Sequence, residues 1–195
     1  MPSEVEIPDA MQSLLKAAQS AGDGLPPVDK WEPEYCGEMD MVIKRDGSWW
    51  HEGRQITRHR LTRLFSTILR KDDDGIHYLV TPVEKIAITV DVAPFVAVRM
   101  DRVGEGQTQR LVFTTNFDTP VEAGPDHRLR FLPDRETGEL LPLVHIRGRL
   151  EALLSRPVYY ELADLAVEKD GVFGIWSDGA FFPMQADEEA GSGAG

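Results

Sequence analysis

Two expected strand ends carry small polar side chains that could contact a ligand. The first is Thr81-Pro82-Val83-Glu84-Lys85, where Thr81 offers a hydroxyl and Glu84 a carboxylate. The second is Thr114-Thr115-Asn116-Phe117-Asp118, where Asn116 can donate and accept hydrogen bonds at once, as a base edge or a carboxamide requires. A β-turn with exposed side chains and an Asx turn are the alternative explanations, and neither needs a ligand.

Arginines near tyrosines offer a different chemistry. Guanidinium groups bind phosphate or carboxylate through paired hydrogen bonds, and tyrosine rings stack on flat groups. An early helix carries Arg63 on its polar side, although a solvated helix face can simply carry arginines. Thr81, Glu84 and Asn116 are therefore the predicted polar contacts, and Arg63 or Arg147 is the predicted partner of an anionic group. The later set of arginines and tyrosines comprises Arg147, Arg149, Arg156, Tyr159 and Tyr160.

The motifs of common catalytic and cofactor-binding families are absent from the sequence. It has no Gly-x-Ser-x-Gly elbow, no phosphate loop ending in Gly-Lys-Ser/Thr, no His-Glu-x-x-His, and no Gly-x-Gly-x-x-Gly between a strand and a helix. The five histidines lack metal-ligand spacing. A single cysteine excludes an internal disulfide and a cysteine-rich metal site. The sequence therefore names no reaction, no catalytic residue, no metal and no cofactor.

The net charge of −12 comes mostly from the two ends of the chain. Residues 1–40 hold nine acids and two bases, residues 185–195 hold three acids, and the body between them is nearly neutral. Residues 41–71 form a basic patch of eight Lys/Arg against two acids, and this patch could meet an anion. A nucleic-acid partner is not expected, because such binding needs a net basic footprint.

The length of 195 residues and an apolar content of 42% are those of an ordinary globular protein with one large or two small domains. No apolar run approaches the roughly 18 residues that a membrane span needs. The N-terminal residues Met1-Pro2-Ser3-Glu4-Val5-Glu6 are acidic, where a secretory signal is basic and then apolar. We therefore expect a cytoplasmic protein with no membrane partner.

Periodicity and turn residues predict helix, hairpin, helix and three strands in the front half. A capped amphipathic helix is expected from Asp9 to about Ala21, followed by a proline-rich extended strap over residues 25–33. The helix after the hairpin runs from Arg58 to about Arg70, because its apolar residues recur at i, i+3, i+4, i+7 and i+8. Strands are expected at residues 76–81, 85–92 and 95–100.

Three strands, a helix and a hairpin are expected in the back half. The strands fall at residues 109–117, 127–132 and 140–146, separated by glycine and proline. From Arg147 the spacing of Leu150, Leu153 and Leu154 is helical. Pro157 is expected to kink this helix or to begin a second one.

Similar hairpins lie near the two ends of the chain. Asp46-Gly47 and Asp170-Gly171 are each followed by an aromatic strand and a second acid-Gly turn. Asp-Gly between strand-like runs predicts a two-residue type I′ turn, which needs positive φ at both positions. The repetition predicts an α+β protein with two related lobes, antiparallel sheets and packed helices. The expected division is an N-terminal helix at 1–24, lobes at 25–104 and 105–184, and a flexible acidic tail at 185–195.

Six short stretches, taken in order, carry a family resemblance over residues 25–184. They are Pro26-Pro27-Val28-Asp29-Lys30-Trp31, Asp46-Gly47-Ser48-Trp49, Leu61-Thr62-Arg63-Leu64-Phe65-Ser66, Thr81-Pro82-Val83-Glu84-Lys85, Thr115-Asn116 and Pro157-Val158-Tyr159-Tyr160-Glu161-Leu162. The chain resembles the bacterial family labelled domain of unknown function 1285. The resemblance implies two related α+β lobes with internal duplication, the second loosely like a pleckstrin-homology fold. It also implies a groove between the lobes for a nucleotide-like ligand in signal transduction, and no catalytic residues.

The leading hypothesis is a cytoplasmic regulatory or signalling protein that binds a small anionic, nucleotide-like ligand in the groove between its lobes. A protein-protein interaction module without a small-molecule ligand is the alternative, and an exposed apolar patch without a deep pocket would favour it. An uncharacterised hydrolase or transferase ranks third. It would require His51, His59 or Glu84 to meet another polar side chain in a concave site.

Overall fold

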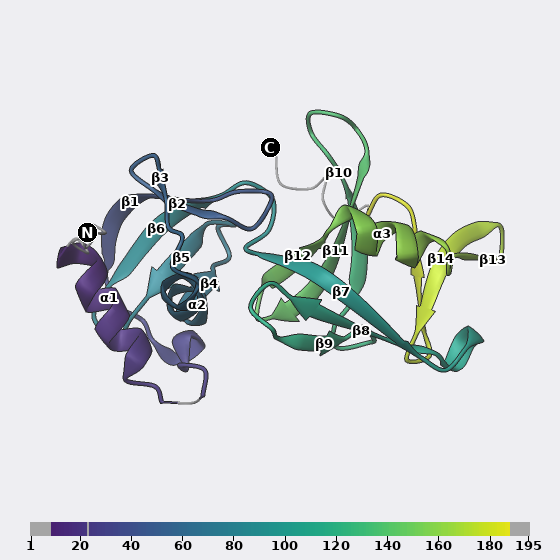
Figure 1. The fold of residues 1–195 in the computed structure, drawn as a ribbon, viewed down its shortest axis with the longest axis horizontal. Coiled ribbons are helices and arrows are strands. Elements are labelled where there is room, and N and C mark those ends of the chain that lie inside the picture. Colours follow the sequence, from purple (N-terminus) through teal and green to yellow (C-terminus); the bar gives the residue numbers. More distant parts are fainter. Residues whose placement is uncertain (1–8, 23, 188–195) are drawn as a thin grey trace. The chain divides into compact units, whose positions relative to one another are not determined.

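The computed structural model describes residues 9–22 and 24–187, and its contacts divide the chain into two units (Figure 1). The first unit takes the described residues up to Lys44 together with Ser48–Asp91. The second takes Arg45–Gly47 and the described residues from Val92 onward. The boundary at 91/92 differs from the division at 104/105 proposed from the sequence, since residue 104 follows directly after a strand of the second unit.

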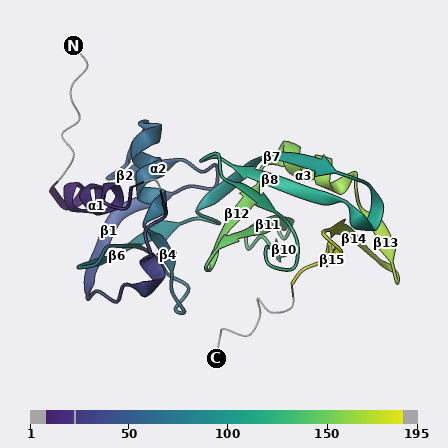
Figure 2. The ribbon, with the colours of Figure 1, turned by 90° about the horizontal axis from the view of Figure 1, so that it is seen from below.

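The first unit is a six-stranded sheet with two α-helices and a short 3₁₀ helix. Its elements are α1 (Asp9–Gln19), η1 (Val28–Lys30), β1 (Tyr35–Ile43), β2 (Trp49–His51), β3 (Arg54–Gln55), α2 (His59–Thr67), β4 (Leu69–Lys71), β5 (His77–Val80) and β6 (Lys85–Val90). The strand order is β3-β2-β1-β6-β5-β4, with β1 and β6 parallel and the other neighbours antiparallel. Helices α1 and α2 contact each other and lie on the same face of this sheet (Figure 2).

Apolar side chains bury both faces of the first sheet. On the helix side, Trp49 of β2 is 1% exposed and stacks on Phe65 of α2, with ring centroids 6.1 Å apart. A second buried cluster of Tyr78, Val80 and Ala87 is covered by Trp31 of the strap. Alternate strand residues face opposite ways, so the two clusters lie on opposite faces. The strap is thus anchored by Trp31, but it is not extended throughout as predicted, because η1 interrupts it.

The second unit combines a six-stranded sheet, a three-stranded sheet and one α-helix. Its elements are β7 (Phe95–Val103), η2 (Gly106–Thr108), β8 (Arg110–Thr115), β9 (Pro120–Glu122), β10 (Leu129–Pro133), β11 (Leu140–Arg147), β12 (Leu150–Leu154), α3 (Arg156–Ala163), β13 (Val167–Lys169), β14 (Val172–Ser177) and β15 (Ala180–Pro183). The large sheet is ordered β10-β11-β12-β7-β8-β9 and the small one β13-β14-β15. Helix α3 packs beside β7 (Figure 1).

Both six-stranded sheets have the same topology. Each consists of two antiparallel three-stranded meanders, and the first strand of the earlier meander pairs in parallel with the last strand of the later one. These parallel pairs are β1 with β6 and β7 with β12. The two related lobes expected from the sequence are therefore present, as sheet-rich units. The expected antiparallel pairing holds for the other strand neighbours, but each six-stranded sheet is mixed because it contains one parallel pair.

The repeated hairpins do not occupy equivalent positions in the two units. The first belongs to the six-stranded sheet as β1–β2–β3, whereas the second forms the separate sheet β13–β14–β15. By topology, the equivalent of the β1–β2 hairpin is β7–β8. The similar sequences at the two ends thus reflect a shared local turn chemistry, and the shared topology lies elsewhere.

The segment from Leu150 to Leu154 is strand β12, and its predicted helix was wrong. It pairs antiparallel with β11 and parallel with β7, and nearly all of its side chains are buried. A strand buried on both faces has no alternation of polar and apolar residues, so its leucines match a helical spacing by coincidence. The helix begins only at Arg156, with Pro157 in its first turn.

The two Asp-Gly turns also differ in conformation. Asp170 and Gly171 both have positive φ (52° and 81°), as the type I′ prediction requires. In the earlier turn only Gly47 does (85°), and the amide of Lys44 donates to the carbonyl of Ser48 at 2.9 Å. The loop is therefore three residues long, Arg45–Gly47, and its last residue is left-handed. These three residues are the ones that belong to the second unit.

Candidate functional site

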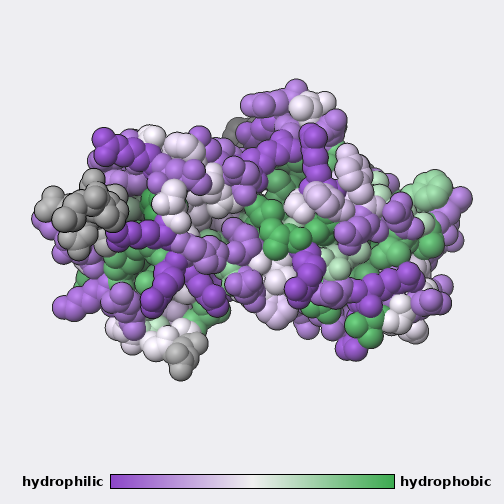
Figure 3. Space-filling view, viewed as in Figure 1, coloured by the Kyte–Doolittle hydropathy of each residue, from purple (hydrophilic) through white to green (hydrophobic). Residues whose placement is uncertain are grey.

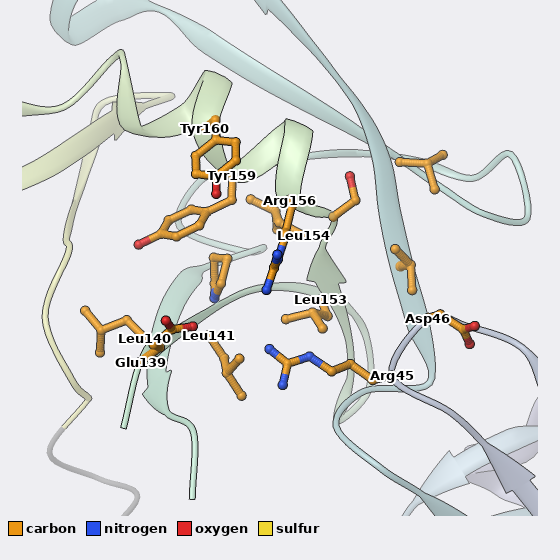
Figure 4. Close-up of a pocket in the computed structure, with 14 residues that line it drawn as sticks. Arg45, Asp46, Glu139, Leu140, Leu141, Leu153, Leu154, Arg156, Tyr159 and Tyr160 are labelled. Carbon is orange, nitrogen blue, oxygen red and sulfur yellow. The ribbon is translucent and has the colours of Figure 1, made fainter. Parts of the chain in front are cut away.

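A pocket of about 1010 Å³ opens on the second unit, beside the N-terminal end of α3 (Figure 4). This volume is at the upper end of what small-molecule sites usually offer. Its wall is mostly aliphatic, and Figure 3 shows apolar surface bordered by hydrophilic groups over β11 and β12. The lining residues are Arg45, Asp46, Val96, Val98, Glu139, Leu140, Leu141, Pro142, Leu153, Leu154, Ser155, Arg156, Tyr159 and Tyr160.

An ion pair fixes the guanidinium of Arg45 at this pocket. Its Nη1 donates to Oδ2 of Asp134 at 2.7 Å, and Arg45 is half exposed while Asp134 is only 8% exposed. The other carboxylate oxygen of Asp134 accepts the backbone amide of Glu136 at 2.9 Å. These hydrogen bonds, first that from Glu136 and then that from Arg45, lower the pKa of Asp134 below its usual value. Asp134 therefore stays ionised, and it orients Arg45 from outside the pocket lining.

Arg156, the other arginine of the pocket, differs from Arg45 in how its side chain is held. It is the first residue of α3, and its exposed side chain points into the pocket toward the guanidinium of Arg45 (Figure 4). Within residues 9–22 and 24–187, the structure gives Arg156 no hydrogen bond or ion pair. Two guanidinium groups that face each other repel, so an acceptor group between them would be favourable. Paired donors of this kind suit the oxygens of a carboxylate or phosphate.

Two tyrosines form one border of the pocket. Tyr159 and Tyr160 of α3 lie with their rings 18° from parallel and their centroids 6.5 Å apart. Tyr159 also contacts buried Phe131, whereas Tyr160 is 64% exposed. The inner ring is therefore held by the core, and the outer one is available to an apolar or flat group of a ligand.

The loop that carries Arg45 sits tightly on β7. A Cβ at Gly47 would lie 2.9 Å from Cγ2 of Val96 and 3.0 Å from Nδ2 of Asn116. Asn116 in turn donates its backbone amide to the carbonyl of Val96 at 2.8 Å, and its Oδ1 accepts the amide of Val96 at 3.1 Å. Asn116, one of the predicted ligand contacts, thus supports the loop from behind and does not line the pocket.

The predicted contacts Thr81 and Glu84 share one turn of the first unit. Thr81 is only 2% exposed. Its hydroxyl oxygen accepts hydrogen bonds from the backbone amides of Val83 at 3.3 Å and Glu84 at 3.1 Å. The Glu84 carboxylate accepts the hydroxyl of Ser13 on α1 at 2.7 Å. Both side chains therefore have structural partners: one closes the turn, and the other ties the turn to α1.

The two predicted anion-binding arginines lie in different units. Arg63 is exposed on α2, and Arg147 at the end of β11 lies over the ring of Phe95 at 5.3 Å. Neither lines the pocket described above. Of the later arginine and tyrosine set, the structure brings Arg156, Tyr159 and Tyr160 together there.

Sequence reasoning missed the role of Arg45 and Asp134. The two residues are 89 positions apart, so no local motif links them. In the sequence, Arg45 belongs to a basic patch. Its position next to the Asp46-Gly47 turn is the only local feature that could have indicated a role in a loop. Asp134 begins a turn after a strand, where an Asx-type carboxylate that binds backbone amides is common.

The fold and this pocket define a two-unit, sheet-rich α+β protein with a largely aliphatic pocket in its second unit. No group of three or more potential metal ligands occurs in the described part of the chain. No described helix is long and apolar enough to cross a membrane.

The chain belongs to the DUF1285 family, a family of unknown function. The family model for its N-terminal domain matches residues 26–93, and the model for its C-terminal domain matches residues 94–184. The resemblance inferred from the sequence is thereby confirmed. No curated protein matches the chain.

Two solved structures of DUF1285 family proteins are similar to this chain. The protein from Silicibacter pomeroyi DSS-3 is 46% identical, with a TM-score of 0.83 over 91% of this chain and 97% of that one. The protein from Shewanella baltica OS155 is 23% identical, with a TM-score of 0.50 over 65% of this chain and 91% of that one, and supports the fold alone.

Proposed function

We propose that this protein is a regulatory protein that binds a small organic anion in the pocket of its second unit. The observation that carries the proposal is the pair of guanidinium groups of Arg45 and Arg156, which point toward each other above an aliphatic wall (Figure 4). Asp134 holds one of them in place, and the other has unused donors. Oriented, unused donors in a largely apolar pocket are the arrangement that binds an organic anion.

A ligand-binding role is favoured over an interaction module by the pocket itself, because the module was expected to present an apolar patch without a deep pocket. An enzymatic role has less support. His51, His59 and Glu84 do not line this pocket, and the Glu84 carboxylate accepts a hydrogen bond from the exposed hydroxyl of Ser13. The pocket's remaining hydroxyls, those of Ser155, Tyr159 and Tyr160, have no histidine beside them among its lining residues.

Several finer parts of the sequence hypothesis stay proposals. They are a nucleotide-like ligand, a role in signal transduction in the cytoplasm, and a pleckstrin-like second lobe. A nucleotide would use the tyrosines for stacking and the arginines for its phosphates, so it belongs in the test below.

The test is a thermal-shift screen of the full chain against organic carboxylates, phosphorylated metabolites and nucleotides at millimolar concentration. A ligand present at 100 times its dissociation constant stabilises the folded state by about 2.7 kcal/mol, which raises the melting temperature measurably. Arg156→Ala should abolish the shift. The matched control is Arg102→Ala, which removes the same charge from an exposed residue of β7 outside the pocket. An equal shift in wild type and Arg156→Ala, or none with any anion, would refute the proposal.

A further inference from the structure

The charges around the pocket restrict which anion it can take. Two arginines, Arg45 and Arg156, are set against two carboxylates: Glu139 in the lining, and Asp134, which is paired with Arg45. The formal charge of these four groups is therefore zero, even though the pocket contains two guanidinium groups. Figure 4 shows the guanidinium groups in the middle of the site with Glu139 to one side of them, whereas the carboxylate of Asp46 is turned away from them.

This balance favours a single negative charge over two. The first negative charge of a ligand meets Arg156, whose donors are unused, and Arg45, whose charge is already shared with Asp134. A second charge on the same ligand would have no unshared cation left and would face Glu139. A phosphate monoester carries about −1.5 to −2 at neutral pH, and a nucleoside di- or triphosphate carries more. Repulsion between like charges a few ångströms apart costs on the order of 1 kcal/mol or more per pair in a partly solvated site.

The wall of the pocket indicates the rest of the ligand. Seven aliphatic side chains line it, against two tyrosines at one border: Val96, Val98, Leu140, Leu141, Pro142, Leu153 and Leu154. Five of the seven, Val96, Leu141, Pro142, Leu153 and Leu154, are less than 9% exposed, so they belong to a preformed core surface. A purely polar ligand would leave this wall in contact with water and gain nothing from it.

We infer that the ligand is an amphipathic monocarboxylate, with its carboxylate between Arg45 and Arg156 and its apolar body on the wall formed by β11 and β12. This inference rests on the proposed function and narrows it, because it ranks carboxylates above phosphates and nucleotides. Glu139 is the residue that determines the specificity, since its carboxylate faces the anion site from the β10–β11 connection (Figure 4) and makes no hydrogen bond or ion pair within residues 9–22 and 24–187.

The test uses ligands that share one tail and differ in their head group. Octanoate, octyl phosphate and octylamine, all below their aggregation concentrations, are titrated calorimetrically into the full chain at pH 8, with AMP and inorganic phosphate alongside. Octanoate should bind at least tenfold more tightly than octyl phosphate, and octylamine should not bind. Lengthening the acid from hexanoate to octanoate to decanoate should raise the affinity about fourfold per methylene, which corresponds to about 0.8 kcal/mol.

Three variants separate specificity from folding. Glu139→Gln should raise the affinity for octyl phosphate several-fold and narrow the tenfold preference, because it removes one repulsive charge from an exposed residue. Arg156→Ala should weaken octanoate at least tenfold, while Arg156→Lys, which keeps the charge, should restore part of the affinity. Far-UV circular dichroism of each variant checks that the fold is intact.

The outcomes distinguish the inference from the proposed function. If octyl phosphate or AMP binds more tightly than octanoate and Arg156→Ala abolishes that binding, the monocarboxylate inference is wrong and the anion site stands. If octylamine binds as tightly as octanoate, or if Arg156→Ala changes no affinity, the pocket does not select anions and both are wrong.

Discussion

Each of the two units contains an arginine cluster built on an aspartate, and the clusters differ in how many donors they use internally. In the first unit, Arg70 donates to both oxygens of Asp72 and, through Nη1, to the carbonyls of Val28 at 2.8 Å and Trp31 at 2.7 Å. In the second unit, Arg45 has one aspartate partner, and Arg156 has none within the described residues.

The number of donors already used within the protein separates a structural arginine from one that could bind a ligand. Arg70 is only 15% exposed, and its donors fasten the strap 25–33 to strand β4, so it is a structural residue. Burial alone would raise the pKa of Asp72, but hydrogen bonds from Arg70 and Lys85 hold it below its usual value. Arginines with all donors satisfied stabilise a fold, whereas oriented arginines with donors left over can bind a ligand.

Replacing Arg70 should produce the largest effect on stability. Arg70→Ala leaves Asp72 and two carbonyls of the strap without their donor, and breaking a largely buried ion pair costs about 3 kcal/mol. Arg156→Ala should change the free energy of unfolding by less than about 0.5 kcal/mol, because it removes an exposed side chain without protein partners. Urea unfolding at pH 7 measures both values.

Hydrogen exchange refines this comparison. In Arg70→Ala, amides of residues 28–33 should exchange faster, since the strap loses its attachment. The structural role assigned to Arg70 is wrong if the two arginine variants lose the same stability, or if the strap stays protected in Arg70→Ala.

Acid should destabilise the first unit through His77. Burial, together with the charge of Lys71, lowers the pKa of His77 from 6.5 to about 4. Between these values the unfolded chain binds the proton and the folded chain does not. Stability is therefore complete above pH 6.5, falls as the pH is lowered toward 4, and loses about 3 kcal/mol over this range. Below the folded pKa the effect levels off.

The control is His77→Gln, which has a polar side chain that does not titrate. Urea unfolding at pH 7 and pH 4 measures how much unfolding free energy each protein loses on acidification. This loss should be about 3 kcal/mol smaller for His77→Gln than for the wild type. Parallel pH profiles for the two proteins would show that His77 does not keep its neutral form in the fold.

A smaller effect is expected from the loop that carries Arg45. Gly47→Ala combines a left-handed φ of 85° with close approach to Val96 and Asn116, and should cost about 2 kcal/mol. Gly53→Ala is the matched control: its φ is 74°, but nothing lies within 4 Å of the added carbon, so only backbone strain of about 1 kcal/mol is expected. Thermal unfolding compares the two.

Ligand binding makes the same comparison sharper. Gly47→Ala should also weaken the anion-induced thermal shift, because it displaces the loop that places Arg45, whereas Gly53→Ala should leave that shift unchanged. Equal effects of both alanines on binding would contradict the tight seating of the loop on β7.

Local sequence patterns were sufficient to predict helices with one apolar face and hairpins with a specific turn. The amphipathic helix at the start, the helix from His59 and the closing Asp170-Gly171 hairpin all follow from periodicity or turn chemistry. The pattern failed at Leu150–Leu154, where burial on both faces removes the alternation of a strand. The parallel pairs β1–β6 and β7–β12 could not be predicted either, because they join residues far apart in the chain.

Only some of the pocket's residues could be predicted, because the others come from distant parts of the chain. Arg156, Tyr159 and Tyr160 were selected together because one helix carries them. Arg45 joins them through a loop of a distant hairpin and an ion pair to Asp134, which no spacing rule shows. Thr81 and Asn116, selected as small polar residues at strand ends, do not line this pocket, and their side-chain oxygen atoms accept backbone amides.

The smallest effect is expected where a predicted ligand contact has a structural partner. Ser13→Ala removes the hydrogen bond from α1 to Glu84, and because the pair is exposed it should cost only about 0.5 kcal/mol. Glu84→Gln should cost a similar amount, and the double variant should cost less than the two together, since both changes disrupt one contact. None of the three should alter the anion-induced thermal shift that depends on Arg156. A loss of that shift in Glu84→Gln with Ser13→Ala unaffected would return Glu84 to the ligand site. The contrast between a structural cluster in the first unit and the binding role proposed for the second would then no longer hold.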